Sequence, residues 1–300
     1  MKYIGVKEAA KKWGISDRRV RILCDDGRVE GAIKLEWSWT IPADAPKPFD
    51  GRTMRPFKNN SVRLGTIDLT TLMNLREENK GYDRMSDKVK ALRVDNLTLA
   101  LALSREKFQK KSIEQILSGK VIASTSLEKH LLYSNFSSLL ITTKENSFLW
   151  DSKRVLELHQ SFVQGIDDIT GGSYRDGFSD VKSESGDALK IKYQMETLFM
   201  QFDREWKGIN EIFKAVLMFG QIMKIKPFES HNEDFALLLL LCMLESAGYI
   251  IPAFDSDMCD EINASLSLAY RRDSYQDLAR IVERSLIKSY HIPSLTVREK

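Results

Sequence analysis

The 300-residue sequence contains few residues of the types that usually hold disulfides or metals. Its three cysteines, Cys24, Cys242 and Cys259, lie far apart and form no CxxC pair. This excludes a disulfide scaffold and a zinc ribbon. The histidines are dispersed, without HxxxH spacing or neighbouring cysteines. We therefore expect no metal site and no cofactor.

Long hydrophobic runs are also missing. The N-terminus, MKYIGVKEAAKKWG, has no apolar core of the kind found in secretory signals. The most apolar run covers residues 235–244, which is well short of the roughly 20 residues that a bilayer requires. We expect a cytoplasmic protein that does not bind a membrane, with this run as a buried helix.

The charges nearly balance over the chain but not along it. The net charge is +3, and residues 1–58 hold 13 lysines and arginines against 8 acids. The remaining residues therefore total −2, so the positive charge belongs to the N-terminal fifth. With 43% hydrophobic residues the chain can bury a sizeable core, which excludes disordered and fibrous classes.

Proline is scarce except in one segment. Four of the seven prolines lie within residues 41–58, which predicts a semi-rigid linker. We predict a small domain at 1–46, a linker at 47–58 and a mostly α-helical domain at 59–300. Helical spacing of apolar residues predicts helices at 69–78, 88–103, 105–117, 153–165, 188–203, 206–224, 234–247, 257–268 and 274–289.

The N-terminal residues follow helix-turn-helix order. The pattern predicts a helix over 4–13, a turn at Gly14, and a second helix that Ser16 caps and Gly27 ends. Alternation after it predicts a two-stranded wing that turns near residues 35–37. The residues expected to contact DNA are basic and lie on the second helix or the wing: Arg18, Arg19, Arg21 and Lys34.

Residues 3–46 resemble the winged helix-turn-helix domains of the MerR and excisionase families. The phrase GRVEGAIKLEWSWTIPADAPKP carries most of the resemblance, which implies a DNA-binding domain. Glu36 departs from it, because an acid at the wing tip would face phosphate. Two other interpretations stay open: the arginines form only a solvated helix face, or the module contacts protein.

Residues 226–234, KPFESHNED, lie between two strongly apolar segments. They resemble the Fic-family pattern HPFx(D/E)GN(G/K)RxxR. The resemblance implies an all-α bundle; many members transfer a nucleotide monophosphate from ATP to a protein hydroxyl. There the histidine acts as general base and the acid holds Mg²⁺. The turn and the arginines bind the phosphates.

Two further segments resemble Fic landmarks. Residues 165–187 are rich in glycine, serine and aspartate, and predict a β-hairpin. Within it Gly172, Tyr174 and Arg175 match the G-x-Y-R flap that pairs with a target strand. Ser124 and Glu128 match the S/T-x-x-x-E inhibitory helix, whose glutamate pairs with the second motif arginine. Lys129 replaces the small or amide residue usual after it.

The motif departs from the family pattern at most chemical positions. Only Pro227, Phe228 and Asn232 keep it. The replaced positions are the base (Lys226), the metal-binding acid (Ser230), the turn glycines (His231 and Glu233) and the arginines (Asp234 and Leu237).

These replacements predict an inactive site. A lysine ammonium is protonated at neutral pH and is no base, and serine is a poor Mg²⁺ ligand. Replacing one arginine by aspartate reverses about 3 kcal/mol of attraction for phosphate at ~5 Å and an effective dielectric constant of ~20.

A purely structural interpretation explains the same residues. Phe228 becomes a core anchor, and Asn232 caps a helix whose dipole Glu233 and Asp234 complement. A sharper hypothesis pairs Glu128 with Lys226, which would hold the former inhibitory helix closed.

We therefore predict a DNA-binding regulator with a catalytically inactive Fic-like domain that senses a ligand, dimerises or binds protein. Its expected partners are DNA, a second copy of the chain and a protein or peptide at the flap. Two alternatives stay open. One is a divergent Fic-type AMP transferase that uses Lys226 differently. The other is an antitoxin-like or scaffold module that binds protein and not DNA.

Overall fold

The computed structural model divides into two compact units, Met1–Arg55 and Pro56–Lys300. It describes residues 3–25, 29, 31–35, 38–47, 64–143, 150–166, 169–175 and 186–292. The division falls inside the proline-rich range 47–58, most of which lies outside the described residues.

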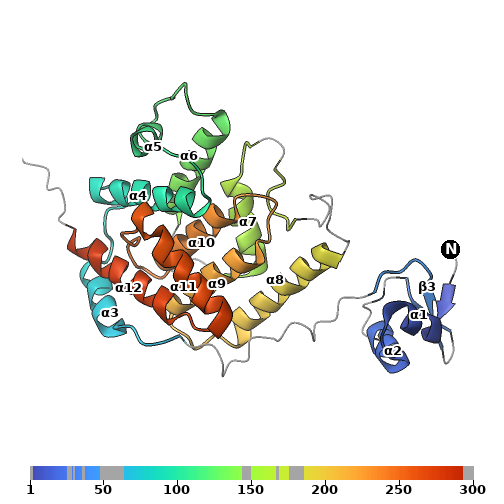
Figure 1. The fold of residues 1–300 in the computed structure, drawn as a ribbon. Helices are drawn as coiled ribbons and strands as arrows, with labels where there is room; N and C mark the ends of the chain where they lie inside the picture. The colour runs from blue at the N-terminus through green and yellow to red at the C-terminus, as the bar shows by residue number, and fades with distance from the viewer. Residues whose placement is uncertain are drawn as a thin grey trace, which may run out of the picture. The chain divides into compact units, whose positions relative to one another are not determined.

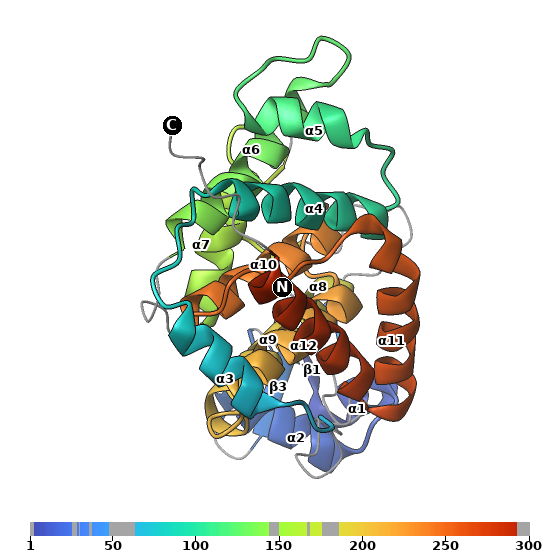
Figure 2. The same cartoon turned by 90° about the vertical axis from the view of Figure 1, so that its left-hand side faces the viewer.

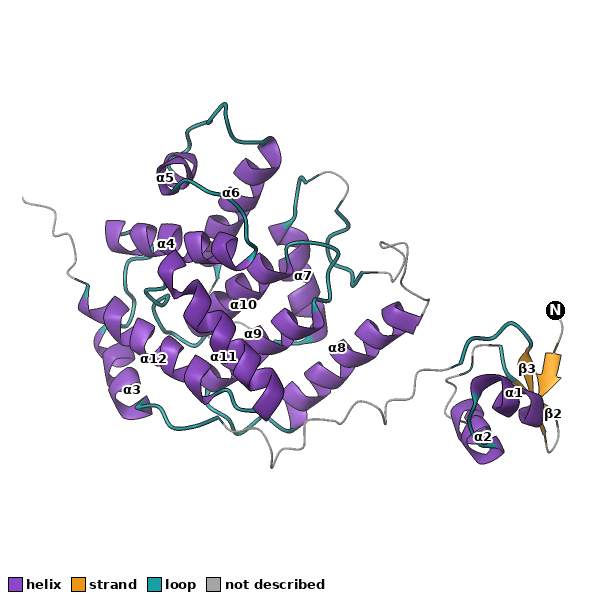
Figure 3. Ribbon diagram, viewed as in Figure 1, coloured by secondary structure: helices purple, strands orange, loops and turns teal. Residues whose placement is uncertain are grey.

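The N-terminal unit consists of two short helices and a three-stranded antiparallel sheet (Figure 3). The strand order is β1-β3-β2, so the predicted wing strands β2 and β3 pair directly. The tip of the wing, including Glu36, lies outside the described residues. The elements are β1 (Tyr3–Gly5), α1 (Val6–Trp13), α2 (Asp17–Asp25), β2 (Ile33–Leu35) and β3 (Ser38–Pro42).

Local sequence explains most of this unit. Gly14 ends α1 with φ +64°, a left-handed conformation that favours glycine. The Ser16 hydroxyl accepts a hydrogen bond from the Arg19 N–H, as predicted for the cap of α2. The prediction of a helix from residue 4 was wrong by two residues. Ile4 instead pairs with Ile41, because β3 offers its edge to the chain before α1.

The unit has its own small core. In the described part of this unit ten apolar residues are buried, among them Trp13 of α1 and three residues of α2, Val20, Leu23 and Cys24. The Trp13 indole N–H also donates to the carbonyl oxygen of Ala45, which ties α1 to the chain after the sheet.

The second unit is all-α in its described residues (Figure 1). Its helices are α3 (Leu69–Glu78), α4 (Asp87–Leu103), α5 (Lys110–Leu117), α6 (Leu127–Thr142), α7 (Ser152–Phe162), α8 (Gly186–Arg204), α9 (Glu211–Ile225), α10 (Asn232–Ser246), a short 3₁₀ turn (Ser256–Met258), α11 (Cys259–Arg272) and α12 (Gln276–His291).

Helices α9 and α10 form the centre of this unit, with the other helices packed around them (Figure 2). Every residue of α10 except Glu233 is buried, as expected for a helix that is apolar on all sides. Gly220 lets α9 approach the start of α12, because a Cβ there would lie 2.5 Å from the ring of Tyr275.

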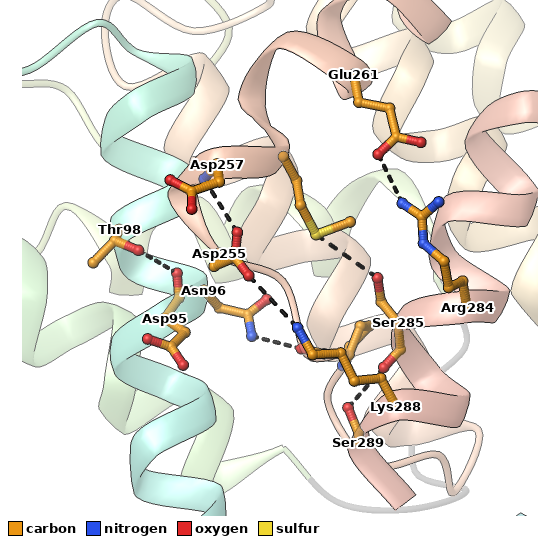
Figure 4. A network of polar contacts seen from close by, with 12 residues as sticks. Asp95, Asn96, Thr98, Asp255, Asp257, Glu261, Arg284, Ser285, Lys288 and Ser289 are labelled. Atoms are coloured by element: carbon orange, nitrogen blue, oxygen red, sulfur yellow. Dashed lines mark hydrogen bonds and ion pairs between the residues drawn. The ribbon is translucent and has the colours of Figure 1, made fainter. Parts of the chain in front are cut away.

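Polar contacts join the outer helices to the segment before α11 (Figure 4). The buried Asn96 amide of α4 donates to the carbonyl of Pro252 at 2.8 Å. The Ser289 hydroxyl of α12 donates to the carbonyl of Ile251, also at 2.8 Å. A non-helical segment inside the core thereby finds partners for its backbone groups.

The mostly helical fold class was predicted correctly, and the helix over 69–78 matches α3 at both ends. The helix predicted from residue 105 was wrong at its start. Arg105 has φ +58°, which is incompatible with a right-handed helix, and α5 begins at Lys110. Among the described residues, no helix combines the length and apolar character needed to cross a bilayer.

Candidate functional site

The KPFESHNED segment forms the connection between the two central helices. It begins at Lys226, which ends α9 with φ +48°, and it leads into α10 through His231 at φ +54°. His231 occupies a position where the Fic pattern has glycine, and its backbone keeps the left-handed conformation that glycine favours. A side chain in that conformation costs about 1–2 kcal/mol. We call residues 226–231 the motif loop.

Asn232 clamps the motif loop. Its amide oxygen accepts a hydrogen bond from the Phe228 N–H at 2.8 Å, and its amide nitrogen donates to the Phe228 carbonyl at 2.9 Å. Asn232 is the first residue of α10 and is buried. The prediction that Asn232 caps the helix was therefore wrong, because its side chain forms hydrogen bonds with the backbone of Phe228 in the motif loop.

Phe228 anchors the loop in the core, as predicted. Its side chain is 1% exposed, and its ring stacks on the imidazole of His159 with centroids 3.7 Å apart. Phe235 of α10 meets the same ring edge-on. The motif loop is thus fixed by two kinds of contact: the aromatic packing of Phe228 and the hydrogen bonds of Asn232 to the Phe228 backbone.

The Lys226 ammonium at the position of the catalytic base forms an ion pair. Its Nζ lies 2.6 Å from Oε1 of Glu233, in the first turn of α10. The hypothesis that Glu128 pairs with Lys226 was wrong. Glu128 instead faces His231, with Oε1 3.5 Å from the ring Nε2.

His231 lies between two carboxylates. Its Nδ1 is 3.2 Å from Oδ2 of Asp234, and its other ring nitrogen faces Glu128. Burial by itself lowers the pKa of His231, but the hydrogen bond to Asp234 and the charges of Asp234, Glu106 and Glu128 together raise it. The loop end therefore favours a protonated, cationic imidazole.

Asp234, at the position of the first motif arginine, is 3% exposed. Burial raises the pKa of its carboxyl, while hydrogen bonds from His231 and Ser104 act in the opposite direction. The Ser104 hydroxyl donates to Oδ1 at 2.6 Å. A carboxylate thus occupies the interior at a place where the family pattern has a guanidinium.

The side chains at two further replaced motif positions are turned into the protein. Leu237, at the second arginine position, is fully buried in the core. The Ser230 hydroxyl, at the position of the metal-binding acid, is buried and has no hydrogen-bond partner among the described residues.

The flap-like residues reach the motif loop. The Arg175 N–H donates to the carbonyl of Pro227 at 2.8 Å, and its Nε donates to the carbonyl of Lys226 at 2.9 Å. The Tyr174 hydroxyl lies 2.9 Å from that of Ser152. Residues 169–175 contain no strand, and most of the hairpin predicted at 165–187 lies outside the described residues.

Gly172 lies against α7. Its N–H donates to Nδ1 of His159 at 3.3 Å, and an added Cβ would lie 3.2 Å from Gln160. The backbone has φ +74° here, so glycine is required for the conformation as well as for the close approach.

The segment resembling the inhibitory helix starts later than predicted. Ser124 is exposed and precedes α6, whose cap is the Ser126 hydroxyl. Glu128 lies in the first turn, with its side chain half exposed. Lys129 pairs with Glu106 at 2.9 Å, so this helix end takes part in the charged cluster around His231.

In the N-terminal unit, the predicted basic residues differ in exposure. Arg18 and Arg21 are exposed at i, i+3 spacing on α2, whereas Arg19 is half-buried. Lys34 lies 3.7 Å from Asp25 and 5.6 Å from the centre of the Trp39 ring. Arg18 and Arg21 are therefore the pair that α2 presents outward.

Sequence reasoning missed three residues that the fold brings to the motif loop: Ser104, Glu106 and His159. The first two follow α4, about 120 residues before the motif. His159 is one of the dispersed histidines of the sequence. Only its place on the apolar face of α7, with Val155 and Phe162, could have indicated a buried role.

Comparison with known proteins agrees with this geometry. Residues 149–244 match the Fic/DOC family model. Residues 134–508 of Fic-1 from C. elegans superpose with a TM-score of 0.60 at 18% identity, covering 74% of this chain and 68% of that one. A Fic family protein from Desulfovibrio desulfuricans G20 gives 0.56 at 14% identity, with coverage of 76% and 75%.

A Fic domain containing signaling protein from Bacteroides thetaiotaomicron VPI-5482 gives a TM-score of 0.57 at 14% identity, with coverage of 74% and 93%. No match was found among curated proteins. The fold is thus Fic-like and all-α, and the family model together with the solved structures supports a Fic/DOC family domain in this chain.

Replacing Asn232 by alanine tests the loop clamp. We expect Asn232→Ala to lower the free energy of unfolding by about 2–3 kcal/mol, because the buried N–H and C=O of Phe228 lose their partners. Urea denaturation followed by circular dichroism measures the loss. Asn263→Ala, an exposed change on α11, is the matched control and should cost less than about 0.5 kcal/mol. Equal losses would contradict the clamp.

His159 should make stability depend on pH. Burial, with a smaller effect of the His231 charge, lowers the pKa of His159 from 6.5 to about 4. The unfolded chain therefore takes up a proton before the folded chain does, and stability falls as the pH drops from 6.5 toward 4. Between pH 7 and 5 this loss is about 2 kcal/mol.

The His159→Phe variant keeps a ring against Phe228 and should lack this part of the pH dependence in urea denaturation. His291→Gln, which changes an exposed histidine, should keep it. The free energy of unfolding of His159→Phe and of the natural protein is plotted against pH. If the two plots run parallel from pH 7 to 5, the prediction that His159 is a buried neutral imidazole is contradicted.

Proposed function

We propose that this protein is a DNA-binding regulator whose Fic-like domain does not transfer nucleotides. The observation that carries the proposal is the ion pairing of the motif loop. Lys226 is paired with Glu233, and His231 is paired with Asp234. The positions that would act on ATP are thus engaged with the protein's own side chains.

The proposal follows from three missing functions. A lysine ammonium held 2.6 Å from a carboxylate does not accept a proton from an incoming hydroxyl. The N-terminus of α10, which would bind a phosphate, carries Glu233 and Asp234 in its first turn. At the second arginine position, the buried side chain of Leu237 offers no charge to a terminal phosphate.

The N-terminal unit supports the DNA-binding part of the proposal. It has two helices joined by a glycine turn and a paired strand ribbon, which is the element order expected of a winged helix-turn-helix. The second helix presents Arg18 and Arg21 outward. One unit of this size makes few phosphate contacts, so we expect two copies of the chain to bind together.

An ATP assay tests the first half of the proposal. We expect no protein labelling from ATP labelled at the α-phosphate, and no rise in thermal midpoint with Mg²⁺ and ATP. A nucleotide at 100 times its dissociation constant would add about 2.7 kcal/mol of stability.

The Glu128→Gly variant distinguishes two causes of inactivity: a block by the segment that resembles the inhibitory helix, and the absence of the catalytic and phosphate-binding groups. If the segment resembling the inhibitory helix alone silenced the site, this variant would gain labelling. We expect none, because the base and the phosphate-binding groups are also missing. Labelling that disappears in Lys226→Ala would overturn the proposal and establish the divergent transferase.

A gel shift with random-sequence DNA tests the second half. The double variant Arg18→Ala/Arg21→Ala should bind more weakly, and its slope of log affinity against log salt should fall by about 2, since each lost phosphate contact removes roughly 0.9. The control Lys7→Ala/Lys11→Ala removes two exposed charges from α1 instead. Equal weakening of DNA binding in the two double variants would contradict a recognition role for α2. If the natural protein gives no gel shift even at low salt, the alternative of a scaffold module that binds protein and not DNA is favoured.

A further inference from the structure

Three potential metal ligands from distant parts of the sequence meet at the end of the motif loop. Glu106 follows α4, His231 precedes α10, and Asp234 lies in the first turn of α10. One donor atom from each lies within 4.8 Å of the others. None of them is at the motif position of the metal-binding acid, which is Ser230. We call these residues the Glu106–His231–Asp234 cluster.

The donor set fits a divalent transition metal better than Mg²⁺. One imidazole nitrogen and two carboxylate oxygens are ligands that Zn²⁺ binds at about 2.0–2.2 Å, whereas Mg²⁺ prefers oxygen alone. Ligands around a tetrahedral ion lie about 3.3 Å apart at those bond lengths. Nδ1 of His231 and Oδ2 of Asp234 are already 3.2 Å apart, so Glu106 has to approach them.

The side chains around the cluster are held as metal ligands usually are. The Ser104 hydroxyl donates to Oδ1 of Asp234 at 2.6 Å, which leaves Oδ2 directed at His231. Lys129 holds Glu106 at 2.9 Å. Such second contacts orient ligands and raise metal affinity.

A buried donor beside the cluster lacks a partner. His159 is 1% exposed, and its Nε2 has no hydrogen-bond partner among the described residues. Since Nδ1 accepts the Gly172 N–H, the ring proton is on Nε2. Both rings border one aromatic cluster: Phe235 meets the His159 ring edge-on with centroids 5.1 Å apart, and Phe162 meets the His231 ring edge-on at 6.4 Å. An N–H of this kind suits a water molecule or anion that completes the coordination of an ion.

The charge balance also favours a cation. Glu106, Glu128 and Asp234 bring three carboxylates to His231, and Lys129 supplies one ammonium. We propose that Glu106, His231 and Asp234 bind one divalent transition-metal ion of the Zn²⁺ class, with the Glu128 carboxylate as a neighbouring fourth group. The ion would join α10 to the start of α6 and the segment after α4. This site does not depend on the proposed function.

Calorimetric titration of the metal-free full chain with ZnCl₂ tests the site. We expect one ion per chain, together with a higher thermal midpoint. Glu106→Gln and His231→Gln should each weaken binding at least ~tenfold. MgCl₂ at the same concentrations should not compete. Glu106→Gln is the decisive variant if His231→Gln fails to fold, because the Glu106 side chain is 28% exposed.

Matched controls exclude binding elsewhere. His291→Gln and Glu114→Gln change an exposed histidine and an exposed glutamate of the same unit, and both should bind as the natural protein does. Cys259→Ser tests the partly exposed thiol in the same way. No stoichiometric binding, binding that persists in Glu106→Gln, or binding lost in Cys259→Ser would each overturn the proposal.

Discussion

Helix α10 begins inside the protein, and a buried helix N-terminus requires negative charge. Its first N–H groups have no partners within the helix, and the peptide dipoles sum to a partial positive charge there. In a nucleotide-binding Fic-like site, phosphate would supply the counter-charge. Here Glu233 and Asp234 supply it from the first turn of the helix itself. A buried carboxylate such as Asp234 then requires its own partners, and much of the site follows from that demand.

Those partners come from the motif loop itself and from the segment after α4. Lys226 neutralises Glu233, while His231 and Ser104 share Asp234. The two basic side chains of the loop, Lys226 and His231, are thus engaged with the protein's own carboxylates. The exchange also reverses the preference of the site, because carboxylates gathered around an imidazole attract cations. The proposed loss of phosphate affinity and the proposed metal affinity therefore have one electrostatic cause.

Local patterns predicted the helices well, since apolar spacing and capping residues act within a few positions. The ends of α3 and the Ser16 cap of α2 are examples. The motif also predicted correctly that this segment connects two apolar helices and that Glu233 and Asp234 lie in the first turn of the second. The pairing within it could not be predicted, because Glu128 had two cations within plausible reach and only the packing of α6 selects His231. Likewise, no motif in the sequence marks Ser104 or Glu106 as residues of the site.

The motif positions that keep the family residue differ in physical role from those that do not. Phe228 stacks in the aromatic cluster, Asn232 clamps the loop, and the carbonyl of Pro227 receives the Arg175 N–H. These contacts determine the path of the chain between α9 and α10. The positions that the family pattern gives to the base, the metal-binding acid and the arginines carry other residue types here, while the backbone at His231 keeps the conformation that glycine favours. The motif loop therefore keeps its backbone conformation, while the residue types at the chemical positions of the pattern differ. This combination would suit a domain that has a structural or sensing role.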